Sequence, residues 1–198
     1  MSKTNFSRTS IFRFTLLTPL FLLLSAFQTA PVQEIQFYYT DNGHVSFKSE
    51  AKQELIKAVS DELRGILDPV HRTYVFKVAL QTFKGFNSTL QQEHFNEKYL
   101  ETEKYPEATF MGKIIETVDL TKDGVYDIRA KGKFWIHGVE QERIIRSTIT
   151  INGGKVELES HFNVLLSDHN IKVPKVVHEK IASEISIDVK AVLNKKYK

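Results

Sequence analysis

The 198-residue sequence contains no cysteine. This absence excludes a disulfide framework, thiolate chemistry and a lipid-modified N-terminal cysteine. A Gly-x-Ser-x-Gly nucleophile elbow and a glycine-rich phosphate loop are missing as well, and Asn152-Gly153-Gly154-Lys155 has the composition of a hairpin turn. The sequence therefore offers no anchor for nucleophilic catalysis, and the fold must be held together by its core and its backbone hydrogen bonds.

The chain after residue 30 has no surplus of positive charge. Lys3, Arg8 and Arg13 account for the whole difference between the chain's 27 basic and 24 acidic residues. Nucleic-acid binding favours an excess of basic residues on one face, so we expect no nucleic-acid partner. Hydrophobic residues make up 41% and charged residues 26%, which are proportions typical of a soluble globular domain.

Residues 1–30 differ in composition from the rest. A basic start is followed by an apolar run at residues 16–27 and by the small residues Thr29 and Ala30. This order is typical of a secretory signal peptide. We expect cleavage between Ala26 and Pro31, and a mature domain of residues 31–198 that is periplasmic or secreted. The alternative is an uncleaved membrane anchor, which needs about 20 apolar residues.

Strand patterns with a period of two dominate the remaining chain. The longest alternation puts one set of side chains on a shared apolar face: Tyr126, Ile128, Ala130, Gly132, Phe134 and Ile136. Shorter alternations occur at residues 45–48, 74–81, 110–114, 145–151, 156–164 and 185–193. Turn signals stand at Asp41-Asn42-Gly43, Lys122-Asp123-Gly124 and Asn152-Gly153-Gly154. Strands with one apolar face, joined by short turns, predict an antiparallel sandwich or closed barrel.

Three segments depart from this pattern. Residues 90–100 read as a short helix with Phe95 and Tyr99 on one face, and Pro174–Lys180 as a second helix. The segment Ala51–Leu67 is ambiguous. Its apolar residues at 55, 59, 63 and 67 have helical spacing, whereas those at 56, 58, 60, 63 and 65 fit a bulged strand. The pattern alone leaves both structures open.

Three motifs occur in an order that resembles the signatures of YceI-like domains. The first is residues 90–100, followed by Tyr105-Pro106 and Phe110. The second is residues 130–139, and the third is Phe162-Asn163-Val164 with residues 167–171. The resemblance covers roughly residues 35–193. It implies an all-β fold, namely an eight-stranded antiparallel up-and-down lipocalin-like barrel with one or two short helices. It also implies that Ala51–Leu67 is a strand, and that the barrel holds a long isoprenoid or fatty-amide ligand.

Eight strands enclose an interior just wide enough for packed side chains or for one small ligand. Small inward residues leave volume for a lipid tail: Ala58, Ser60, Ala130, Gly132, Ser147 and Ser160. The alternative is that five inward rings fill the barrel as a solid core: Phe47, Phe76, Phe110, Phe134 and Phe162. The residues that we expect to bind the ligand are Phe47, Phe76, Val78, Leu80, Phe83, Phe86, His94, Phe95, Tyr99, Phe110, Ile114, Ile128, Phe134, Ile136, Phe162 and Val164.

Four of these residues lie beside the expected helix: Phe83, Phe86, Phe95 and Tyr99. They form either the mouth of the cavity or a plug that only docks the helix, and the sequence leaves both interpretations open. His94 is a polar group that fixes the helix or meets a ligand head group.

The seven histidines do not form a metal-binding pattern, because a transition metal needs three or four converging ligands. Alternation places His137 and His161 on the outer face. We therefore expect neither a metal nor another cofactor. Five basic residues are expected outside the barrel as a solvated face rather than a membrane-binding patch: Arg129, Lys131, Lys133, Arg143 and Arg146.

The sequence favours a non-enzymatic protein that binds, stores or transports a hydrophobic lipid-like ligand, such as an isoprenoid, quinone or fatty amide. One alternative is a solid-cored barrel that serves a membrane-protein partner through the outward-facing Trp135. The other is a lipid isomerase or hydrolase, which needs an ionisable residue facing the cavity. Among the inward residues only His94 meets that need.

Overall fold

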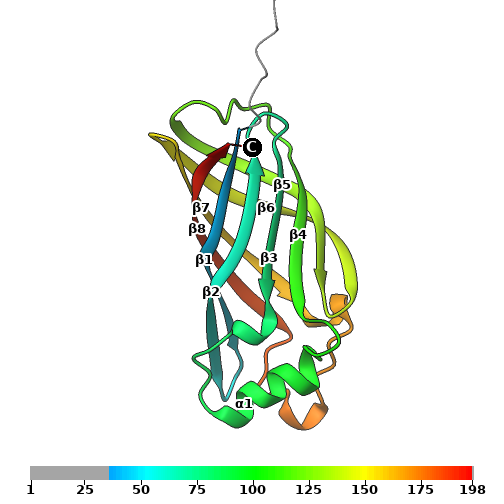
Figure 1. Ribbon diagram of the computed structural model, residues 1–198. Coiled ribbons are helices and arrows are strands. Elements are labelled where there is room, and N and C mark those ends of the chain that lie inside the picture. The colour runs from blue at the N-terminus through cyan, green and yellow to red at the C-terminus, as the bar shows by residue number, and fades with distance from the viewer. Residues whose placement is uncertain (1–35, 198) are drawn as a thin grey trace, which may run out of the picture. The chain divides into compact units, whose positions relative to one another are not determined.

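The computed structural model describes residues 36–197, which form a closed antiparallel barrel in the order β1 to β8 (Figure 1). The strands are β1 (Gln36–Glu50), β2 (Leu55–Asp68), β3 (Thr73–Ala79), β4 (Glu107–Ile114), β5 (Gly124–Ile136), β6 (Val139–Asn152), β7 (Lys155–Leu165) and β8 (Glu184–Tyr197). The expected eight-stranded barrel is confirmed. The expected signal peptide, residues 1–30, lies outside the described residues.

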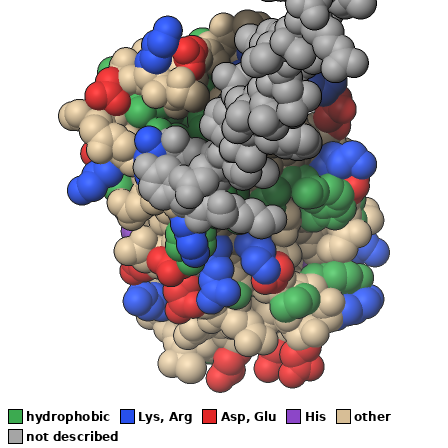
Figure 2. Space-filling view, turned by 45° about the horizontal axis from the view of Figure 1, so that its top comes forward, with side chains coloured by type: hydrophobic (Ala, Val, Ile, Leu, Met, Phe, Trp, Pro, Cys, Tyr) green, Lys and Arg blue, Asp and Glu red, His purple; other side chains and the backbone are tan. Residues whose placement is uncertain are grey.

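The alternation read from the sequence sets the inside and the outside of the wall. Along β5, Ile128, Ala130 and Phe134 are buried, whereas Arg129 and Lys131 between them are exposed. Acidic and basic side chains are interspersed on the outer surface (Figure 2). Several form ion pairs across neighbouring strands, such as Lys131 with Glu142. Because the strands pair in a closed circle, each of β1 to β8 has a partner strand on both sides.

The segment Ala51–Leu67 contains strand β2 and no helix, as the family resemblance implied. The helical interpretation is wrong because a bulge disguises the period of two. Ser60 and Leu63 are both buried, and the two residues between them are exposed. The bulge shifts the alternation by one residue and produces apolar spacing that resembles a helix.

The expected turn at Asp41-Asn42-Gly43 is also wrong. Strand β1 runs through it, and the pairing register shifts between Thr40 and Gly43 and again between Gly43 and Val45. A Cβ atom on Gly43 would lie 3.2 Å from the Cβ atoms of both Leu63 and Ala191. The glycine therefore permits a close approach of strands at a bulge, which bends the wall instead of reversing the chain.

The two ends of the barrel differ. At one end, here called the helix end, β3 continues into α1 (Thr89–His94) and a single π-helical segment, Phe95–Tyr99, which confirms the helix expected at residues 90–100. The second expected helix is only a 3₁₀ turn at Lys175–Val177. At the other end, here called the closed end, Tyr38, Leu120 and Ile151 are fully buried in the core. No helix among the described residues has the length and apolar character needed to cross a membrane.

Candidate ligand-binding cavity

A cavity of about 510 Å³ occupies the barrel interior and is lined mainly by apolar side chains. Its volume lies within the range of small-molecule sites, roughly 300–1,000 Å³. The inward phenylalanine rings therefore do not fill the barrel as a solid core. All sixteen residues expected to bind a ligand line this cavity, although their contact with a ligand stays a prediction.

Four phenylalanines form one group at the helix end, and we call it the mouth cluster: Phe47, Phe83, Phe86 and Phe95. Phe47 of β1 stacks on Phe95 with ring centroids 5.4 Å apart and an interplanar angle of 8°. Phe86 and Phe95 lie 5.0 Å apart. These rings hold the helical segment against β1, and they line the cavity, as Tyr99 does. Their role as the mouth through which a ligand enters stays a prediction.

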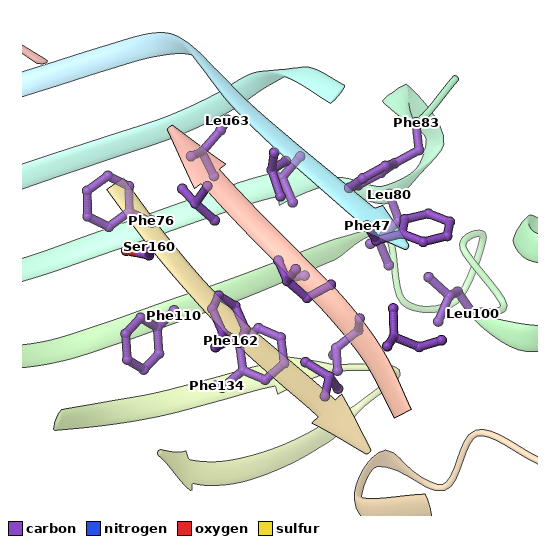
Figure 3. A pocket seen from close by; sticks show the side chains of 18 of the residues that line it. Phe47, Leu63, Phe76, Leu80, Phe83, Leu100, Phe110, Phe134, Ser160 and Phe162 are labelled. Atoms are coloured by element: carbon purple, nitrogen blue, oxygen red, sulfur yellow. The ribbon is translucent and has the colours of Figure 1, made fainter. Parts of the chain in front are cut away.

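A second group of aromatic rings follows the wall deeper in the barrel, and we call it the wall cluster: Tyr74, Phe76, Phe110, Phe134 and Phe162. Figure 3 shows Phe76, Phe110, Phe134 and Phe162 around a shared space, with Phe47 and Phe83 farther along it. A Cβ atom on Gly65 would lie 2.2 Å from ring atoms of Phe76. The glycine thus lets this ring lie flat on the wall, which keeps the interior open.

A pair of serine hydroxyl groups interrupts the apolar lining between β6 and β7. Ser147 and Ser160 face each other from β6 and β7, and their Oγ atoms are 2.6 Å apart. One hydroxyl donates to the other, so the two side chains share one hydrogen bond within the wall of the cavity. Their small side chains leave space in the cavity that larger residues would occupy.

Tyr74 is a cavity-lining residue that the sequence analysis did not select. Its side chain is buried beside Phe110, and its hydroxyl has no hydrogen-bond partner among the described residues. Burial raises the pKa of Tyr74 above its ordinary value, so the phenol stays neutral. The alternation had placed Tyr74 inward with Phe76 and Val78, and this was the signal that could have identified it. Tyr74 is thus, like His94, an ionisable residue that lines the cavity.

Several other lining residues were also missed, although their inward alternation was visible in the sequence. They come mainly from β6, β7 and β8: Ile145, Ile149, Val156, Leu158, Ile185, Ile187 and Val189. These strands complete the circle of the wall. Their residues were seen as one apolar face, but the sequence does not show which part of that face borders empty space.

The histidines lie in different surroundings. His94 lines the cavity, and its Nε2 is 2.9 Å from Nζ of Lys98. His161 lies on the outer face, as expected, and its Nδ1 is 2.7 Å from Oδ1 of Asp188. His137 is not on the outer face. Its positive φ of 52° turns it at the end of β5, and its Nδ1 lies 2.9 Å from the carbonyl oxygen of His169.

His169 is a fully buried histidine that was also missed. Its ring meets Phe134 edge-on at 5.3 Å, and its Nδ1 lies 3.3 Å from the Val139 carbonyl oxygen. Burial is the largest cause that lowers the pKa of His169, and the positive charge of Arg143 acts in the same direction. Across residues 36–197, no three histidine, aspartate or glutamate side chains gather as a metal-binding group.

Arg143 does not belong to the outer basic face to which the sequence analysis assigned it. It shares the register of Ile145 and Ser147, and its side chain is only 21% exposed. One guanidinium nitrogen donates to the Asn163 carbonyl oxygen, and the other lies 3.3 Å from Asp168. The pairing of β6 with β7 ends at Ser147 and Ser160, so Arg143 bridges the strands where their backbones separate.

The arrangement suits retention of a nonpolar molecule. The polar groups that line the deep cavity are paired with each other or covered, and the surrounding side chains are aliphatic or aromatic. Burial of an alkyl chain gains about 0.8 kcal/mol per methylene group. A chain of about a dozen methylenes would gain about 10 kcal/mol, which is comparable to the estimated cost of association.

An antiparallel barrel with an apolar interior cavity defines the lipocalin-like class of folds. Within that class, the model of the YceI-like domain matches residues 34–193, and the chain belongs to the YceI-like family. The family resemblance seen in the sequence is thus confirmed. No curated protein matches the chain.

Solved structures share the fold at low sequence identity. A polyisoprenoid binding domain from Saccharophagus degradans has a TM-score of 0.66 and 13% identity, over 81% of this chain and 98% of that one. BcnA from Burkholderia cenocepacia has a TM-score of 0.62 and 16% identity, over 76% and 95% of the chains. The YCEI protein of Campylobacter jejuni has a TM-score of 0.54 and 15% identity, over 68% and 81%.

Proposed function

We propose that this protein binds a nonpolar, chain-like lipid inside its barrel and stores or carries it outside the cytoplasm, without chemical conversion. The observation that carries the proposal is the apolar cavity of about 510 Å³. Membership of the YceI-like family supports it, as does the similar fold of a polyisoprenoid binding domain. The signal-peptide pattern in residues 1–30 supports the location.

An isoprenoid is the ligand that we favour. Its branched and unsaturated chain offers methyl groups and double bonds along its whole length, which suits a cavity lined by both aromatic and aliphatic side chains. A quinone or fatty amide carries the same kind of tail with a polar head. The opening at the helix end would leave such a head in contact with water.

Extraction of the purified protein with organic solvent, followed by mass spectrometry, tests the proposal. We expect close to one lipid per protein, or a delipidated protein that takes up a long-chain isoprenoid alcohol at the same ratio. Ser160→Phe should abolish uptake because the new ring would occupy the cavity. Glu157→Phe is the matched control, since Glu157 is exposed on the outer face of the same strand.

A protein that is reproducibly empty and takes up no long-chain lipid would contradict the proposal. Equal uptake by the Ser160→Phe protein and the parent protein would place the lipid outside the barrel. Circular dichroism of each variant verifies that the strands are intact, so that loss of uptake is separated from loss of the fold.

A further inference from the structure

The cavity reaches the surface at the helix end. Its lining extends to Leu90 and Gln91 of α1 on one side and to Val177, Lys180 and Ile181 on the other. Two apolar side chains at this opening are exposed to solvent. Leu90 is 59% exposed, and Val176 is 91% exposed, the highest value for a large apolar side chain in the described residues.

The segment that presents Val176 is tied to the barrel. The backbone N–H of Gln53 donates to the Glu179 carbonyl oxygen at 2.7 Å. The N–H of Ala182 donates to Oγ of Ser49 at 2.9 Å. Val176 therefore lies on a short 3₁₀ turn that hydrogen bonds hold against the hairpin of β1 and β2. Its side chain is exposed because this ordered backbone presents it to solvent.

Positive charge accompanies the exposed apolar residue. Lys172, Lys175 and Lys180 have no carboxylate within ion-pair distance in the part of the chain that the structure describes. The single acid of this segment, Glu179, is already paired with Lys52. The acidic side chains Glu93 and Glu97 belong to the helical segment across the opening, and Glu54, which accepts from the Gln91 side chain, lines the cavity there.

We propose that the helix end docks on an anionic lipid bilayer, with Val176 and Leu90 entering the interfacial layer and Lys172 and Lys175 meeting lipid head groups. This inference rests on the proposed function, because in this orientation the opening of the cavity faces the membrane from which the bound lipid would come. Basic residues gain about 1 kcal/mol each near an anionic membrane surface, and apolar side chains add burial. The lysines of this segment favour an anionic over a neutral surface.

Sedimentation with lipid vesicles tests the docking. We expect the protein to bind vesicles of phosphatidylcholine mixed with phosphatidylglycerol, to bind pure phosphatidylcholine weakly, and to dissociate as salt is raised. Val176→Glu should weaken binding to the mixed vesicles at least tenfold. Val125→Glu is the matched control, because Val125 is 69% exposed at the closed end and should bind as the parent protein does.

A double substitution of Lys172 and Lys175 by glutamine tests the electrostatic part. Each lysine should contribute about fivefold to binding at low salt, so the pair should cost more than tenfold. The same change at Lys113 and Lys155, on the wall and at the closed end, should have little effect. Equal losses in the two double variants would overturn the proposed orientation.

Uptake of an isoprenoid alcohol in vesicle-free solution is measured in parallel. Val176 does not line the cavity, so Val176→Glu should keep full uptake. If the parent protein takes up no isoprenoid alcohol, the proposed function is contradicted. If it takes up the alcohol but does not bind vesicles, only the docking is contradicted. Concentration-dependent dimerisation that disappears in Val176→Glu, without vesicle binding, would show that a second copy covers this surface and would also overturn the proposal.

Discussion

At the closed end, Leu120 is fully buried and Tyr38 and Ile151 are 2% exposed, whereas Phe76, Phe110 and Phe162 of the wall cluster remain only partly buried. Both groups point inward from the same barrel. The difference lies in what each side chain meets, since the closed-end residues meet other side chains and the wall cluster borders empty space. The closely packed closed end thus contributes more to the stability of the fold. The side chains that border the cavity lack some of the van der Waals contacts that a solid core would provide.

The largest expected difference between the two regions is in stability. Leu120→Ala should lower the free energy of unfolding by about 3 kcal/mol, because it leaves a hole in a filled core. Phe162→Ala should cost only about 1–2 kcal/mol, because part of its ring already borders the cavity. Urea denaturation of the ligand-free proteins measures both values. Equal losses would mean that the interior is as tightly packed as the closed end.

A smaller effect is expected from pH at His169, in the 3₁₀ turn Leu166–His169 that follows β7. The folded-state pKa of His169 lies below its ordinary value of 6.5, so the unfolded chain binds a proton more readily. His169 therefore favours folding above pH 6.5, and this contribution is lost as pH falls from 6.5 toward the folded pKa. The slope from one proton cannot exceed about 1.4 kcal/mol per pH unit.

Urea denaturation between pH 7.5 and pH 5.5 measures this dependence. His169→Asn keeps a donor toward the Val139 carbonyl oxygen and should flatten the curve over that range. The parent protein, measured in parallel, gives the reference slope. An unchanged slope in His169→Asn would show that its burial is not the source of the pH dependence.

The smallest expected effect is at Tyr74. Tyr74→Phe removes a buried hydroxyl that has no partner among the described residues and should stabilise the protein by about 1 kcal/mol. Lipid uptake should change less than twofold, because the hydroxyl is covered. A strong loss of uptake would instead show that the hydroxyl turns toward the ligand.

The sequence predicted the wall of the barrel well, because a period of two follows directly from strand geometry. It failed where an irregularity shifts that period. The bulge between Ser60 and Leu63 imitated a helix, and the bulge around Gly43 imitated a turn. Arg143 was assigned to the outer face because a charged side chain rarely points into a barrel. Its position in the strand, two residues before Ile145, matched the inward register.

The content of the interior was not predictable from the pattern alone. Alternation identified the inward rings, but a solid core and a hollow one have the same alternation. The outcome depends on how each ring lies, for example on Phe76 resting flat over Gly65. The burial of His169 was not predicted, because this residue belongs to a short turn after β7 and carries no periodic signal.

The most direct test of the account is a crystal structure of the protein saturated with a long-chain isoprenoid alcohol. We expect continuous electron density for one chain inside the barrel, running from the mouth cluster past Phe134 and Phe162, with the hydroxyl end toward α1. Lipid density confined to the outer surface, or side chains that meet across the interior and leave no space for an alkyl chain, would contradict it.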